Sequence, residues 1–147
     1  MQLTPNFSLE EFCHSQRADD WDIDNMAPEE LIPVCRYTCE GLERIRAYLG
    51  DKPITLLSGF RTSSLNSLIG GAKNSQHMRG EAADFKCPAF GSPLTTAMFL
   101  EKQMVLLGID QLILEYGRWV HVSFTKTPRH QSLTYTSAGV KSGIVSG

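Results

Sequence analysis

Ten residues near the middle of the chain read Ser75-Gln76-His77-Met78-Arg79-Gly80-Glu81-Ala82-Ala83-Asp84. The polar part that ends at Gly80 is typical of a loop, and residues 81–86 are typical of a strand. A histidine in such a loop and an aspartate seven positions later in the strand can converge on one ion. Two small alanines before the aspartate leave room around such a site. The segment therefore predicts part of a metal site.

A second cluster reads Glu115-Tyr116-Gly117-Arg118-Trp119-Val120-His121, in which the histidine belongs to an apolar strand. Two histidines and one carboxylate form the ligand set of a catalytic zinc that keeps one position open for water. His77, Asp84 and His121 are therefore the candidate ligands of one zinc ion. A glutamate near the bound water can take its proton, and Glu115 is the candidate for that role.

Each of these residues also has an ordinary interpretation when it is taken alone. A histidine in a polar loop, such as His77, is usually an exposed surface residue without a specific role. A histidine in a strand, such as His121, is more often a hydrogen-bonded core residue than a ligand, and Asp84 could be a turn former at a strand end. Only the combination favours a metal site.

The rest of the chain predicts helices first and then mostly strands. Ser8-Leu9-Glu10-Glu11 is a capping box that begins a short helix. Helical spacing of apolar residues continues from Pro28 to Leu49, and Gly50 ends it. The further expectations are a loop over 14–27, a strand over 54–57, helices over 63–69 and 92–107, a loop over 72–80, and strands over 112–114 and 119–124. This order predicts an α+β fold in which helices pack against a small antiparallel sheet.

Length and composition indicate a single domain over residues 1–147, with 125–147 as a peripheral tail rich in Ser, Thr and Gly. The formal net charge of −2, without a run of Lys and Arg, gives no basic surface for nucleic acid. No apolar run is long enough to span a membrane. The four cysteines form no CxxC pair and are expected to be reduced core thiols.

The pattern Ser75-x-His77-x-x-Gly80-x-Ala82-x-Asp84, followed by Trp119-x-His121, resembles the signature of the D-Ala-D-Ala metallopeptidases, peptidase family M15. That group includes bacterial D,D-carboxypeptidases, vancomycin-resistance D,D-dipeptidases and phage L-alanyl-D-glutamate endolysins. The Hedgehog signalling domain shares its fold and metal site. The likeness runs from about Phe7, through Ser58-Gly59-Phe60-Arg61, to about Phe124, which is most of the chain. It implies a Hedgehog/DD-peptidase-like fold.

The resemblance also implies roles for other residues. Arg61 would bind a substrate carboxylate or polarise the scissile carbonyl, because its planar fork suits both tasks; the alternative is a surface ion pair. Ser75 would hydrogen-bond the substrate or orient His77. Trp119 would line the substrate groove or pack in the core.

The general base departs from the commonest family pattern. Several members place the catalytic carboxylate three residues before the last histidine, where this chain has Arg118, which cannot act as a base. Glu115, six residues before His121, has a spacing that resembles Hedgehog-like and some phage-type members. In one continuous strand this even separation puts both side chains on one face. If Gly117 turns a hairpin, Glu115 instead faces the start of the next strand. The alternative for Glu115 is a solvated strand end.

The resemblance therefore implies zinc-dependent hydrolysis of a peptide bond in the peptidoglycan stem peptide, either D-Ala–D-Ala or L-Ala–D-Glu. The alternative is a non-enzymatic domain that keeps zinc for stability, for example as a component of a phage particle. We expect a monomer with no membrane insertion. The first residues lack the features of a signal peptide, so we expect synthesis in the cytoplasm and action on the wall after release, as for a phage lysis enzyme.

Overall fold

The computed structural model describes residues 1–146, and these form an α+β fold, as the sequence predicts. A six-stranded sheet has the strand order β3-β4-β6-β5-β7-β8, and β1 and β2 form a separate small sheet. Neighbouring strands of the large sheet are antiparallel except for the parallel pair β5 and β7. The strands are β1 (Gln2–Thr4), β2 (Phe7–Ser8), β3 (Thr55–Ser58), β4 (Ala82–Lys86), β5 (Gln111–Glu115), β6 (Trp119–Ser123), β7 (Gln131–Thr136) and β8 (Gly139–Ser142).

The helices begin at the capping residues that the sequence offers. Ser8 Oγ accepts from the backbone N–H of Glu11 at the start of α1, and Thr62 and Ser92 cap α4 and α5 in the same way. The α-helices are α1 (Leu9–Cys13), α2 (Gln16–Asp20), α3 (Ile32–Tyr48), α4 (Ser63–Leu68), α5 (Pro93–Glu101) and α6 (Met104–Leu107). Two 3-10 turns, η1 (Glu29–Leu31) and η2 (Gln76–Arg79), complete the set.

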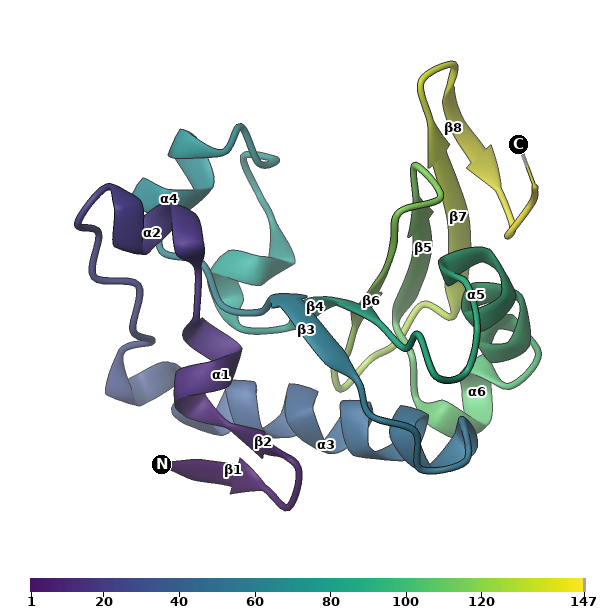
Figure 1. Ribbon diagram of the computed structural model, residues 1–147, viewed down its shortest axis with the longest axis horizontal. Helices are drawn as coiled ribbons and strands as arrows, with labels where there is room; N and C mark the ends of the chain where they lie inside the picture. The colour runs from purple at the N-terminus through teal and green to yellow at the C-terminus, as the bar shows by residue number, and fades with distance from the viewer. Residues whose placement is uncertain (147) are drawn as a thin grey trace.

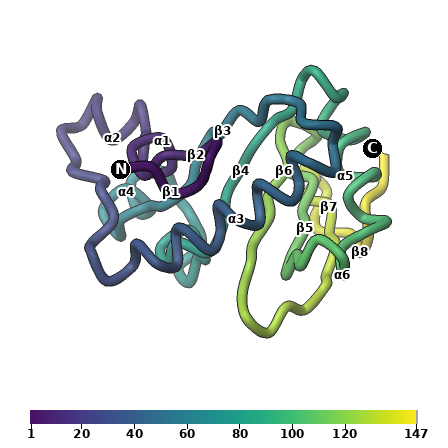
Figure 2. The backbone as a smooth tube through the Cα atoms, turned by 90° about the horizontal axis from the view of Figure 1, so that it is seen from below, coloured from purple at the N-terminus to yellow at the C-terminus, as the bar shows by residue number. Residues whose placement is uncertain are grey.

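The large sheet has one apolar face and one polar face. Alternate residues of its central strands (Ala83, Phe85, Leu112, Leu114, Val120, Val122) are buried in the core together with Leu42 and Ile45 of α3 and Leu100 of α5. Figure 1 shows α3 running beneath the sheet, with α5 and α6 beside its C-terminal strands, and Figure 2 shows the same arrangement from below. The other residues of these strands therefore face away from the core.

Three local expectations are wrong. Residues 14–27 are not all loop, because Ser15 caps the short helix α2, in which Ala18 is buried. The helix expected over 92–107 is broken into α5 and α6, since residues 102–103 leave the helix between them. The loop expected over 72–80 contains the turn η2, which Gly80 ends at a φ of 76°.

Within the expected tail, β7 and β8 extend the edge of the sheet. β7 adds to β5 in parallel, and β8 closes the edge as an antiparallel hairpin partner of β7. The four cysteines are free and buried, which confirms the expected core thiols. Among residues 1–146, no helix has the length and apolar character that a membrane span requires.

Candidate metal centre and substrate groove

The register of the sheet brings two of the three candidate ligands side by side. Asp84 of β4 pairs directly with His121 of β6, so both side chains project from the polar face. The third ligand, His77, comes from the turn η2 just before β4. The structure thus brings together all three ligands that the sequence predicts, and each is buried.

Local contacts fix the loop that carries His77. The Nδ1 atom of His77 lies 2.7 Å from the carbonyl oxygen of Gly59, so Nδ1 is the donor and Nε2 keeps its lone pair. Gly59 is required there, since a Cβ would lie 2.2 Å from the carbonyl oxygen of Phe12. On the other side, Thr38 of α3 donates to the carbonyl of Gly80 at 2.7 Å. The free nitrogen of His77 is therefore held toward Asp84.

The ligand atoms lie close enough together to converge on one zinc ion. His77 Nε2 lies 3.4 Å from Asp84 Oδ2, and His121 Nδ1 lies 2.9 Å from Asp84 Oδ1. One ligand atom from each residue fits within a group in which all separations are at most 4.8 Å. Tetrahedral zinc with bonds of about 2.0–2.2 Å separates its ligand atoms by about 3.3–3.6 Å. The two histidines and the carboxylate therefore fit one zinc ion.

The surroundings of the candidate ligands favour the protonation states that bind a metal. Burial lowers the pKa of His77, which favours the neutral imidazole that binds metals. Burial alone would raise the pKa of Asp84, but the hydrogen bond from His121 Nδ1 helps to hold that pKa below its ordinary value. Asp84 is thus an anion between two imidazoles.

Glu115 reaches the centre from the end of β5. Tyr116 and Gly117 have φ values of 56° and 66°, and the turn that they form brings Glu115 opposite Trp119 on β6. The hairpin alternative is therefore the one that the structure adopts. Glu115 Oε1 lies 3.6 Å from His121 Nδ1. Burial and the charge of Asp84 raise the pKa of Glu115, while His121 and Arg61 oppose this.

Arg61 borders the centre from the opposite side. Its Nη2 lies 3.4 Å from Asp84 Oδ2, its Nε donates to Ser58 Oγ at 3.1 Å, and its Nη1 donates to Asn66 Oδ1 at 3.0 Å. The side chain is only 11% exposed and also lines the groove described below. Arg61 is therefore not an exposed surface residue, and its guanidinium is fixed in one orientation.

Of the two other residues predicted to contact the substrate, one lines the groove and the other does not. Ser75 lines the groove, and its Oγ accepts from the backbone N–H of His77 at 3.1 Å, so it orients the metal loop. Trp119 is not among the residues that line the groove. Its ring contacts Tyr116 edge-on at 6.4 Å between centroids, and its Nε1 is buried without a hydrogen-bond partner among the described residues.

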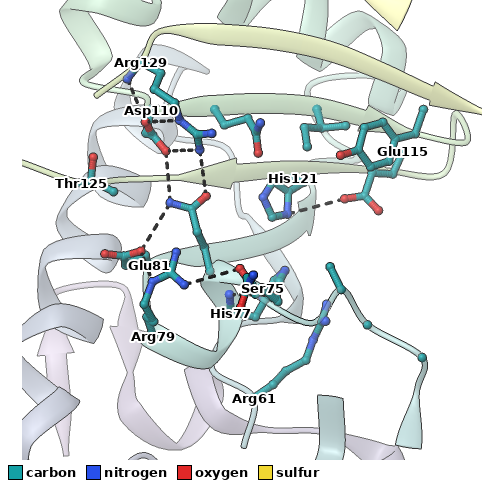
Figure 3. A pocket seen from close by; sticks show the side chains of 18 of the residues that line it. Arg61, Ser75, His77, Arg79, Glu81, Asp110, Glu115, His121, Thr125 and Arg129 are labelled. Atoms are coloured by element: carbon teal, nitrogen blue, oxygen red, sulfur yellow. Dashed lines mark hydrogen bonds and ion pairs between the residues drawn. The ribbon is translucent and has the colours of Figure 1, made fainter. Parts of the chain in front are cut away.

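A groove of about 870 Å³ extends from the metal centre across the polar face. In Figure 3, Glu115 lies at one end, Asp110 and Arg129 lie at the other, and His121 lies between them. The groove is also lined by residues for which the sequence predicts no role: Gln76, Gln111, Thr125, Thr127, Arg129 and Tyr135. Among these residues, only Gln76 could have been predicted from the sequence, because it is a polar residue next to the candidate ligand His77. The position of Tyr135 depends on the parallel pairing of β5 and β7. No local sequence pattern predicts that pairing.

Comparison with known proteins agrees with this geometry. The family model described as Peptidase M15 matches residues 5–123, which include the three candidate ligands, Arg61 and Glu115. A curated relative, the zinc D-Ala-D-Ala carboxypeptidase of Streptomyces albus G, is 40% identical over 81 residues. That alignment covers 54% of this chain and 30% of the relative, so this chain spans only part of the relative's length. Because the family model covers most of the chain and its ligand set is assembled in the structure, this protein belongs to the peptidase M15 family.

Proposed function

We propose that this protein is a zinc-dependent peptidase that hydrolyses a peptide bond in the stem peptide of peptidoglycan. The observation that carries the proposal is the Glu115 carboxylate, which lies 3.6 Å from the ligand His121 at the end of an open groove. A zinc site kept only for stability needs neither a carboxylate beside it nor a groove. Both features support hydrolysis over the non-enzymatic alternative.

The residues divide the chemistry among them. Zinc bound by His77, Asp84 and His121 would polarise the scissile carbonyl and lower the pKa of a water molecule. Glu115 is placed to accept the proton of the attacking water and to pass it to the leaving amine. Arg61, held by three protein acceptors, presents its remaining N–H groups to a carbonyl or carboxylate oxygen of the substrate.

The substrate class comes from the relatives. The curated relative is named for D-Ala-D-Ala carboxypeptidase activity, and this supports a wall peptide as the substrate. Both the D-Ala–D-Ala bond and the L-Ala–D-Glu bond belong to the proposal. Cleavage of the second would fit an endolysin, an enzyme with which a phage degrades the wall of its host.

Products released from purified peptidoglycan test the proposal. Zinc-loaded protein should release stem-peptide fragments that mass spectrometry identifies, and it should leave casein intact. Loss of a terminal alanine would assign a carboxypeptidase, and whole peptides freed from the glycan-linked L-Ala would assign an endopeptidase. If neither product forms with zinc bound, the non-enzymatic alternative becomes the better account.

Arg61→Lys tests the part of the proposal that concerns substrate binding. We expect kcat/KM to fall by about tenfold or more although the charge is kept, because an ammonium group cannot reproduce the planar donor fork. Zinc content, measured by elemental analysis, should stay at the wild-type level, since Arg61 is not a ligand. Wild-type kinetics in this variant would mean that Arg61 only neutralises Asp84.

A further inference from the structure

One wall of the groove comes from the chain beyond the region that the family model matches. That region ends at residue 123, whereas Thr125, Thr127, Arg129 and Tyr135 all line the groove. Three of these residues lie in the connection between β6 and β7, and Tyr135 lies in β7. In Figure 3, Thr125 and Arg129 lie on the side of the groove across from Ser75 and Arg79. A substrate lying in the groove would contact this wall.

The guanidinium of Arg129 is held rigidly at this wall. Its Nε lies 3.0 Å from Asp110 Oδ1 and its Nη2 lies 2.7 Å from Asp110 Oδ2, which is a two-pronged ion pair. The backbone N–H of Arg129 donates to the same carboxylate at 2.8 Å. The neighbouring His130 donates through Nδ1 to the carbonyl of Ile109 at 3.0 Å. The wall therefore holds its shape without a substrate.

The carboxylates near Arg129 are paired with protein donors. Asp110 is 1% exposed and accepts further hydrogen bonds from Ser123 Oγ at 2.9 Å and Gln76 Nε2 at 3.1 Å. Glu81 accepts from Arg79 Nε at 3.0 Å. Both acids are thus neutralised by an arginine, Asp110 by Arg129 and Glu81 by Arg79. This end of the groove thus offers N–H groups to a ligand.

Arg129 keeps donors that no protein group uses. Within residues 1–146, the hydrogen bonds of its guanidinium run from Nε and Nη2, to Asp110 and to Gln76 Oε1, and Nη1 has no partner. The side chain is 52% exposed and lines the groove. A guanidinium fixed in this way presents the two N–H groups of Nη1 in one orientation, and charge-assisted hydrogen bonds from such donors bind carboxylates strongly.

We propose that Arg129 forms a subsite for a carboxylate of the peptide substrate, at a residue away from the scissile bond. The inference rests on the proposed function, which makes the substrate a stem peptide. In that peptide D-Glu is linked through its side chain, so its α-carboxyl group is free to meet such a subsite. The free acid and the α-amide of D-Glu differ only at this group and therefore form a matched pair of ligands.

Binding of this pair to the zinc-loaded Glu115→Gln protein tests the subsite without turnover. The probes are two synthetic stem pentapeptides, L-Ala-γ-D-Glu-L-Lys-D-Ala-D-Ala and its α-amide at D-Glu, and the readout is Kd by calorimetry. We expect the acid to bind about tenfold tighter or more, as a hydrogen bond between charged groups implies. Equal affinities, or no binding of either peptide at millimolar concentration, would overturn the subsite.

Substitutions of two arginines test whether the preference for the acid over the amide comes from Arg129. Arg129→Lys in the same background keeps a cation beside Asp110 and should bind acid and amide within about twofold of each other, because one ammonium group cannot both pair with Asp110 and present the fixed Nη1 donors. Arg118→Lys, on the exposed turn after β5 and outside the groove, is the matched control and should keep the full preference. A preference that survives in Arg129→Lys would place the carboxylate elsewhere.

Hydrolysis of the same two peptides by the wild-type protein separates the two proposals. A preference in binding without hydrolysis of either peptide would contradict the proposed function and retain the subsite. Hydrolysis of both peptides with equal binding would retain the function and overturn the subsite.

Discussion

Replacement of Glu115 by glutamine is expected to lower kcat by about a hundredfold or more, the size of a lost general base. Glutamine keeps the shape of the side chain but cannot accept the proton of the attacking water. The fold and the zinc site should remain intact, because Glu115 is not a member of the ligand group. The measurement is amine release from peptidoglycan at saturating substrate, together with zinc content.

The matched control is Arg118→Gln, three residues before His121, where the family resemblance would place the carboxylate. Arg118 is exposed on the turn after β5, so we expect activity close to that of the wild type. The other carboxylates of the groove are poor substitutes for Glu115, since Asp110 is paired with Arg129 and Glu81 with Arg79. Nearly full activity in the Glu115→Gln protein would therefore contradict this mechanism.

Alanine in place of any one ligand, His77, Asp84 or His121, is expected to abolish tight zinc binding. Two remaining ligands cannot hold the ion against water, and metal binding to the folded state adds to folding free energy. Zinc at about a thousand times its Kd stabilises a protein by about 4 kcal/mol, so the variants should lose a stabilisation of about that size. Thermal unfolding with and without zinc measures this difference.

The wild-type protein treated with a chelator is the control for these variants. It should unfold at a lower temperature than the zinc-loaded protein and recover on addition of zinc, whereas the alanine variants should not respond. Stoichiometric zinc in the His121→Ala protein would contradict the ligand assignment.

The sequence predicted those parts of the site whose position depends on the order of polar and apolar residues within one short segment. The polar loop with Gly80 before an apolar strand placed His77 and Asp84 correctly, and these side chains meet because β4 leads directly out of the loop. The spacing of Glu115 and His121 allowed two geometries. The positive φ values of Tyr116 and Gly117 select the hairpin, which the sequence alone left open.

The parts that the sequence missed depend on contacts between distant segments. Arg129 lies in a tail that composition marked as peripheral, and only the pairing of β7 with β5 and the ion pair to Asp110 bring it to the groove. Trp119 had two interpretations, and the structure places it outside the groove, with its ring against Tyr116, which does line the groove. Such contacts leave no periodic signal along the chain.

A zinc titration of the metal-free protein, with peptide release from purified peptidoglycan as the readout, tests the central claim most directly. Activity should be absent after treatment with a chelator and should rise with added zinc to a plateau at one ion per chain. The Glu115→Gln protein should bind the same amount of zinc and stay at the baseline. Stoichiometric binding of zinc by the wild-type protein with no release of peptide or amino acid would contradict the account.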